Sequence, residues 1–175
     1  MTLTLDTSML WDTYCLIEVC LVWGGRSIPL GQTVLEHGSA TVGFEDYCLV
    51  LETTLKLLPP DVQVTLLADR GFVRVASPQE IHGALIHWLQ THQWSWMIRA
   101  KSDLNITFSK GQTAAVGELL PPEGEAYLFR YVTILHDIEC HLATAHLALA
   151  GEPWAVLSEV PPSLQTVRLS SRRSL

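Results

Sequence analysis

The sequence has little positive charge and lacks the features that mark secreted or membrane proteins. Eleven Lys and Arg residues stand against 18 Asp and Glu residues, which gives a formal net charge of −7. This balance argues against a general nucleic-acid coat, which would be basic, but it does not exclude a small contact patch. No apolar run reaches the roughly 18 residues that a membrane-spanning helix needs. The N-terminus shows no basic segment followed by an apolar one, so we expect no signal peptide.

Cysteine is also scarce, and the four cysteines form no CxxC pair. This pattern indicates free, buried thiols in a cytoplasmic protein. Hydrophobic residues make up 48% of the chain and the mean hydropathy is +0.23. A chain of 175 residues with this composition is long enough to bury a proper core. The cysteines are Cys15, Cys20, Cys48 and Cys140.

Apolar runs and helical spacing predict the order strand, strand, strand, helix, strand, helix, strand over the first hundred residues. An antiparallel meander followed by βαβ units is typical of a ribonuclease H-like mixed sheet, so the expected fold class is α/β. The Pro29 position marks the third strand as an edge strand, because proline cannot donate to the ladder. We expect the second strand to be buried on both faces. The expected strands span 3–6, 14–23, 26–35, 62–68 and 94–100, and the expected helices span 44–58 and 77–90.

Three parts follow from this pattern. Residues 1–101 would form the ribonuclease H-like core, and residues 102–160 a β-rich insertion with strands at 127–135, 140–148 and 154–157. Residues 161–175 form an aberrant tail, because the helix start at Ser163 runs into a serine- and arginine-rich end with no apolar face.

The stretch from Val62 to Phe72 carries the strongest chemical signal. An apolar, β-branched run ends abruptly on Asp69, and Asp6 ends the first predicted strand in the same way. If these strands are neighbours, both carboxylates meet at one edge of the sheet, where they repel unless a cation neutralises them. Mg²⁺ is the natural cation for such a pair. The simpler interpretation of either residue is an Asp that begins a turn or caps the next element.

Four short motifs occur in order and resemble the DDE transposases of bacterial insertion sequences, most closely the insertion-sequence-4-like group. They cover residues 2–101. The motifs are Leu-Thr-Leu-Asp6-Thr-Ser, Gly25-Arg26-Ser-Ile-Pro29-Leu, Leu67-Ala-Asp69-Arg-Gly-Phe72 and Trp96-Met-Ile-Arg99-Ala-Lys101.

The resemblance implies the roles of five residues. Asp6 and Asp69 would be catalytic carboxylates that bind Mg²⁺ or Mn²⁺, and Arg70, Arg99 and Lys101 would contact DNA phosphates. The implied activity is metal-dependent cleavage and transfer of DNA strands at the ends of an insertion sequence. The implied partners are DNA and full-length transposase.

The chain also departs from the family, whose third carboxylate is a Glu within a Tyr-x-x-Arg-x-x-x-Glu helix. No Glu occurs after Glu159. Tyr127 and Arg130 match the first half of that motif, but the Glu position falls on Ile134 and the segment has a strand pattern. We hypothesise a frameshift near Thr166 and expect an inactive remnant of the catalytic core.

Other functions remain open. A non-catalytic fragment could bind DNA or intact transposase and inhibit transposition. A phosphotransferase with an Asp nucleophile is disfavoured because it requires Asp-x-Asp, whereas Asp6 is followed by Thr7 and Ser8. A zinc site in the segment 136–141 is a weaker alternative, because neighbouring strand residues point to opposite faces.

Overall fold

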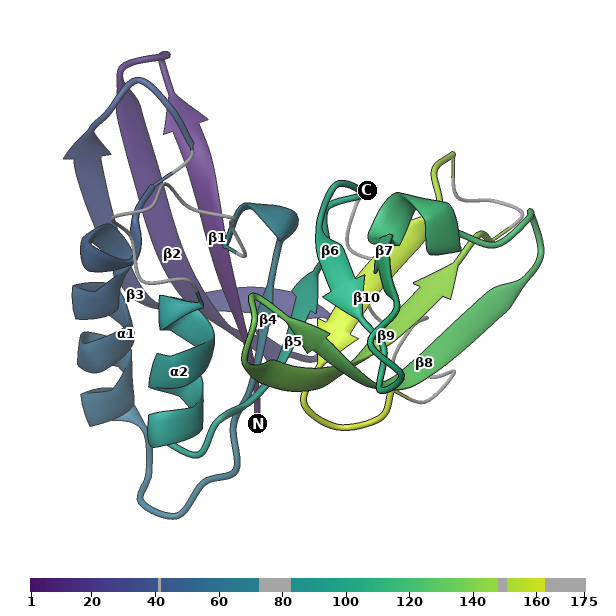
Figure 1. The fold of residues 1–175 in the computed structure, drawn as a ribbon. Coiled ribbons are helices and arrows are strands. Elements are labelled where there is room, and N and C mark those ends of the chain that lie inside the picture. The colour runs from purple at the N-terminus through teal and green to yellow at the C-terminus, as the bar shows by residue number, and fades with distance from the viewer. Residues whose placement is uncertain (41, 73–82, 148–150, 163–175) are drawn as a thin grey trace. The chain divides into compact units, whose positions relative to one another are not determined.

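The structure is a computed structural model that describes residues 1–40, 42–72, 83–147 and 151–162 (Figure 1). The chain divides into two compact units. The first contains residues 1–72 and 84–95, and the second contains the chain from Trp96 onward. Within the described ranges, no helix is long and apolar enough to cross a membrane.

The first unit is built on a mixed sheet of β1 (Thr2–Leu10), β2 (Tyr14–Trp23), β3 (Arg26–Glu36) and β4 (Thr65–Ala68). The order is β3-β2-β1-β4, with β1 to β3 antiparallel and β4 parallel to β1. Both hairpins turn on two residues with positive φ, Trp11 and Asp12 in one and Gly24 and Gly25 in the other. The outer position of β3 confirms the edge strand that Pro29 predicts.

Two helices accompany this sheet. Helix α1 (Phe44–Leu57) begins where the carboxylate of Asp46 accepts a hydrogen bond from the Gly43 backbone N–H at 2.8 Å, and two prolines follow its end. It packs on β2 and β3 (Figure 1). Helix α2 (Ala84–Thr91) buries Leu85, Ile86 and Leu89. Part of the helix predicted over 77–90 lies outside the described residues.

Helix α1 covers one face of the sheet, and this decides which strand residues are buried. Leu5 and Val19 face one another across β1 and β2 and are buried. The next pair, Asp6 and Glu18, points to the opposite face and is exposed or half-buried. The prediction that β2 is buried on both faces is therefore wrong, because its side chains alternate between a covered and a more open face.

The second unit is an antiparallel sheet with the order β5-β10-β9-β8-β6-β7. Its core contains Ile98, Ile106, Ile134 and Leu142, all at most 1% exposed. Strands β6 and β7 were not predicted, because three residues each give no recognisable pattern. The strands are β5 (Ser95–Arg99), β6 (Asn105–Thr107), β7 (Thr113–Ala115), β8 (Ala126–Ile134), β9 (Ile138–Ala145) and β10 (Trp154–Ser158).

The element order up to Arg99 confirms the predicted sequence of strands and helices, and the fold class is α/β. Two short 3₁₀ helices add to it, Arg70–Phe72 directly after β4 and Val116–Leu119 after β7. All four cysteines are free, as predicted, although Cys48 is only half-buried.

The close approach of α1 to β3 depends on Gly31. A Cβ at Gly31 would lie 2.7 Å from the Thr54 hydroxyl oxygen and 3.3 Å from the Val50 carbonyl oxygen. We therefore expect Gly31→Ala to lower the free energy of unfolding by about 1–3 kcal/mol, because the buried helix must shift. Urea denaturation measures the change. Gly38→Ala is the matched control, since its Cβ would meet no atom within 4 Å, and an equal loss in both variants would contradict the prediction.

Candidate functional site

Strands β1 and β4, which precede or carry the two predicted carboxylates, are neighbours and pair in parallel. The register pairs Leu3 with Leu66 and Leu5 with Ala68. Asp6 and Asp69 directly follow the last paired residues, and both are exposed. Because the two strands run parallel and in register, Asp6 and Asp69 occupy equivalent positions in sequence after that pair. The expectation that the strands carrying Asp6 and Asp69 are neighbours is therefore confirmed.

Asp6 does not end its strand, contrary to the sequence prediction. Strand β1 continues to Leu10, and its pairing with β2 extends to Leu10 and Tyr14. The partner on the other side, β4, stops at Ala68. The backbone N–H of Thr7 donates to Asp6 Oδ1 at 2.8 Å, which holds the carboxylate close to the strand. Asp6 therefore lies one residue beyond the stretch of β1 that pairs with β4.

The turn that carries Asp69 is anchored by the last residue of its motif. The Phe72 backbone N–H donates to the Asp69 carbonyl oxygen at 3.2 Å and closes the turn. The Phe72 ring packs edge-on against Tyr47 of α1, with centroids 5.2 Å apart, and Tyr47 is only 4% exposed. Gly71 has no positive φ, and a Cβ there would meet no atom within 4 Å. The turn is thus fixed by Phe72 and does not require the conformational freedom of a glycine at position 71.

Glu18 is a third carboxylate near Asp6 that the sequence analysis did not single out. It is the register partner of Asp6 on β2. Burial raises the pKa of the Cys20 thiol, and the charges of Glu18 and Asp6 raise it further. Both carboxylates therefore lie close enough to the Cys20 thiol for their charges to disfavour its thiolate form. Recognising the Trp11–Asp12 hairpin turn would have revealed the pair, because the turn sets the register.

The donor set fits one hard cation better than two. Mg²⁺ in proteins is usually held by one or two carboxylates, with waters and substrate phosphate completing its shell. Asp6 and Asp69 supply that number. Within the described part of the chain, no three or more His, Cys, Asp or Glu side chains are grouped to hold a metal.

The predicted phosphate contacts have unequal surroundings. In the second unit, the Arg99 guanidinium lies 4.2 Å from the centre of the Trp154 ring, and its Nη2 lies 4.0 Å from Glu152 Oε2. Lys101 follows β5 and is half-buried. Arg70, in the first unit, opens the 3₁₀ turn after Asp69, and its side chain lies outside the described residues. The backbone of Arg70 directly follows Asp69, and Arg99 and Lys101 belong to the second unit.

No protein-family model matches the chain, and no curated protein matches it. Among solved structures, it is similar to the piggyBac transposase in a synaptic complex with hairpin DNA, with 12% identity and a TM-score of 0.54. The fold is transposase-like. The similarity covers 96% of this chain but only 37% of that transposase chain. At this identity the likeness concerns the fold and leaves the site residues to be argued from their own geometry.

The four cysteines differ in burial, and the order in which they react with a thiol reagent tests these differences. Burial, with a smaller contribution from Glu139, raises the pKa of Cys140 to about 12. Burial and the nearby Glu52 and Glu45 raise the pKa of Cys48, which is the only cysteine of the four that is not fully buried. Because the thiolate fraction at pH 8 falls as the pKa rises, and burial limits access to the reagent, we expect iodoacetamide at pH 8 to modify Cys48 first and Cys140 last. Peptide mass spectrometry over time measures the order. Faster labelling of Cys140 in the native protein would contradict it, and urea should remove the difference.

Proposed function

We propose that this chain is a ribonuclease H-like transposase core that binds DNA together with a divalent cation held by Asp6 and Asp69. The observation that carries the proposal is the register of β1 and β4, in which these two exposed residues directly follow the paired residues Leu5 and Ala68. The transposase-like fold supports DNA as the ligand. The four sequence motifs favour the insertion-sequence-4-like group within this class.

The carboxylates would act by binding and orienting. When bound, Mg²⁺ or Mn²⁺ would neutralise charge on a phosphate oxygen and lower the pKa of a bound water. Asp6, held through Oδ1 by the Thr7 N–H, would present its second oxygen to the ligand. Asp69 would be held in place by the turn that Phe72 closes. Both residues are exposed, so water and a DNA strand have access to them.

The basic residues of the motifs would supply the phosphate contacts. The Arg99 guanidinium lies over the Trp154 ring, which limits the rotamers of the arginine. Lys101, two residues later, would act as a point charge on the same DNA backbone. Arg70 follows Asp69 directly and would bind phosphate next to the cation. In this proposal residues 1–101 are the core, 102–160 a β-rich insertion and 161–175 a tail.

We further propose that the chain by itself binds DNA but does not cleave it efficiently. The third carboxylate that the resemblance calls for is not grouped with Asp6 and Asp69 in the part of the chain that the structure describes. A missing ligand weakens stabilisation of the transition state, and each 1.36 kcal/mol lost lowers the rate about tenfold. A fragment that binds without cleaving would fit the alternative role of an inhibitor of intact transposase.

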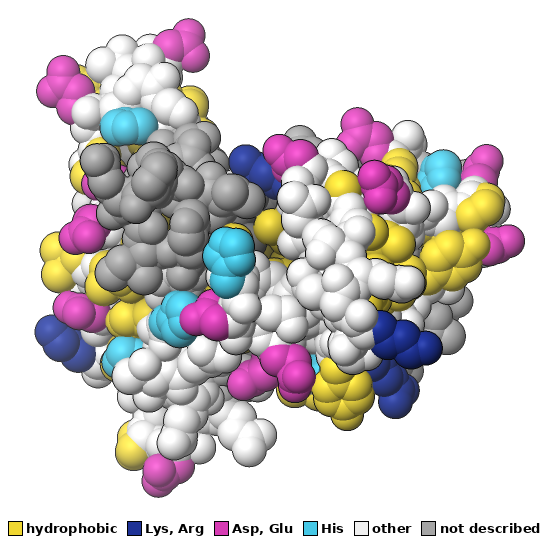
Figure 2. Space-filling view, in the orientation of Figure 1, with side chains coloured by type: hydrophobic (Ala, Val, Ile, Leu, Met, Phe, Trp, Pro, Cys, Tyr) yellow, Lys and Arg dark blue, Asp and Glu magenta, His cyan; other side chains and the backbone are white. Residues whose placement is uncertain are grey.

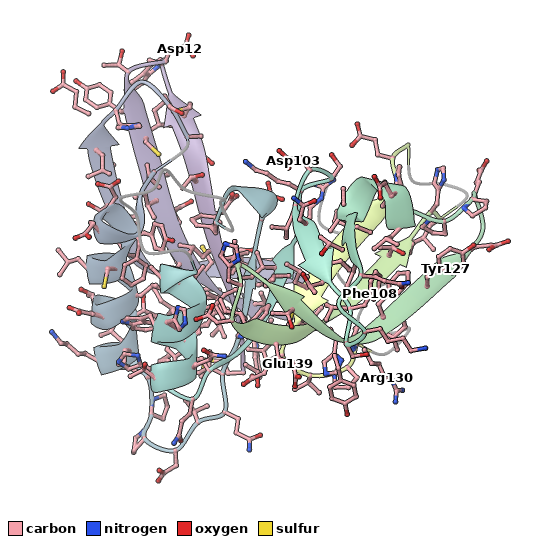
Figure 3. All side chains as sticks on the ribbon, viewed as in Figure 1. Asp12, Asp103, Phe108, Tyr127, Arg130 and Glu139 are labelled. Carbon is pink, nitrogen blue, oxygen red and sulfur yellow. The ribbon has the colours of Figure 1, made fainter. Side chains whose placement is uncertain are left out.

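Mn²⁺ binding tests the carboxylate pair directly. We expect one Mn²⁺ per chain by electron paramagnetic resonance, and a loss of affinity of at least about tenfold in Asp6→Asn and in Asp69→Asn, because each removes a direct ligand. Asp12→Asn, an exposed carboxylate at the tip of the β1–β2 hairpin, is the matched control (Figure 3). Equal affinity in all three variants would refute the site.

Cleavage is tested separately, on supercoiled plasmid with Mn²⁺. We expect no nicking above that of the Asp6→Asn and Asp69→Asn double variant. Nicking by the wild-type chain that disappears in the double variant would support the carboxylate pair and overturn the inactive-core proposal.

A further inference from the structure

Strand β8 of the second unit contains a bulge that turns two residues out of the sheet. Its pairing with β9 shifts register between Phe129 and Val132, so that Arg130 and Tyr131 together stand opposite His141. Tyr131 has a φ of 55°, which is unfavourable for a residue with a large side chain. Its side chain is 58% exposed, and Arg130 is exposed as well. Bulges of this kind re-aim side chains.

A buried histidine holds the bulge in this conformation. His141 is only 6% exposed, and its Nδ1 accepts a hydrogen bond from the Tyr131 backbone N–H at 3.4 Å. The two rings meet edge-on, with centroids 5.1 Å apart. The strained backbone of Tyr131 is therefore fixed by two contacts to one buried side chain. These contacts hold the Tyr131 ring in its outward position in the folded protein.

The surroundings of the bulge combine aromatic rings with positive charge. Phe129 packs against Phe108, with centroids 5.9 Å apart. Lys110 is exposed on the tight turn that follows Phe108, where the Gly111 N–H donates to the Phe108 carbonyl oxygen at 2.8 Å. Figure 2 shows dark-blue cationic side chains beside a hydrophobic one at the lower right of the view, and Figure 3 labels Arg130 in that region.

The start of the same strand is acidic. The Tyr127 hydroxyl donates to the Glu125 carboxylate at 2.8 Å, and this bond raises the pKa of Tyr127. Tyr127 precedes Arg130 by three residues on β8, and Figure 3 labels the two at separate places. A polyanion would therefore be attracted to Arg130 and repelled from the start of the strand.

We propose that the Arg130–Tyr131 bulge is a contact site for single-stranded DNA, in which the Tyr131 ring stacks on a base while Arg130 and Lys110 bind the adjoining phosphates. An exposed aromatic ring beside cations is the arrangement that binds single strands with little sequence preference. The choice of DNA rests on the proposed function, but the contact itself needs neither the cation nor Asp6 and Asp69. Tyr131 is not part of the helical motif that Tyr127 and Arg130 match in part, and stacking on a base would give this exposed ring a function.

The test uses the full chain in EDTA and a fluorescein-labelled oligothymidylate of about 12 nucleotides, a length within the site sizes of single-strand binders. Fluorescence anisotropy measures its affinity. We expect Tyr131→Asn to weaken binding roughly tenfold through loss of stacking, with the salt dependence unchanged. Asparagine tolerates positive φ, so this change removes the ring and keeps the bulge. Tyr131→Phe should bind as the wild type does.

The contribution of Arg130 is tested by the salt dependence of binding. Arg130→Gln should weaken binding and reduce the slope of log affinity against log salt by about 0.7, the value for one phosphate contact on a single strand. Tyr14→Ala, which removes a partly exposed tyrosine from the first unit, is the control and should leave binding unchanged. An abasic oligonucleotide of the same length should bind roughly tenfold more weakly than oligothymidylate.

Three results would overturn the proposal: no binding by the wild type in EDTA, equal binding by wild type and Tyr131→Asn, or equal binding of the abasic and the base-containing strand. Because these measurements are made in EDTA, they do not depend on a cation at Asp6 and Asp69, whereas Mn²⁺ binding does. Failure of the carboxylate site is thereby distinguished from failure of the bulge.

Discussion

The parallel pairing of β1 with β4 is the constraint on which the proposed site depends. The pairing begins where the Thr65 N–H donates to the Met1 carbonyl oxygen at 2.9 Å and continues in register to Leu5 and Ala68. Leu3, Leu5 and Leu66 are almost completely buried, which fixes the face that each strand presents. Because side chains alternate along a strand, a slip of one residue would turn Asp6 toward the covered face. The position of two charged groups is thus set by the burial of three leucines.

The pairing of the two strands that precede Asp6 and Asp69 could be predicted from the sequence because its signal is local. An apolar run that ends on an acidic residue occurs twice, and the order of elements makes those two strands neighbours. The end of β1 could not be predicted in the same way. The first strand was expected to end at Asp6, whereas it runs to Leu10 and turns at Trp11 and Asp12, and a bulky tryptophan seldom adopts the positive φ that it has in this turn. The partner Glu18 was missed for the same reason, since the true turn sets the β1–β2 register.

Features of the second unit that depend on contacts between residues far apart in sequence could not be predicted from the sequence. Strands β6 and β7 are three residues each, and they exist because β8 offers β6 a paired edge. The bulge at Arg130 and Tyr131 depends on His141, ten residues away on the next strand. The sequence analysis rejected a helical motif at Tyr127 and Arg130 because of the strand pattern, and β8 confirms that rejection.

The charge of the chain gives the two proposed DNA contacts different physical roles. With a net charge of −7, the molecule as a whole repels DNA, so binding requires either a bound cation or a local concentration of positive side chains. The carboxylate pair would meet the first condition, since a bound divalent ion would neutralise its two negative charges. The bulge meets the second, with stacking that does not weaken as salt rises. Because one contact needs a metal and the other does not, chelation should separate their contributions to DNA binding.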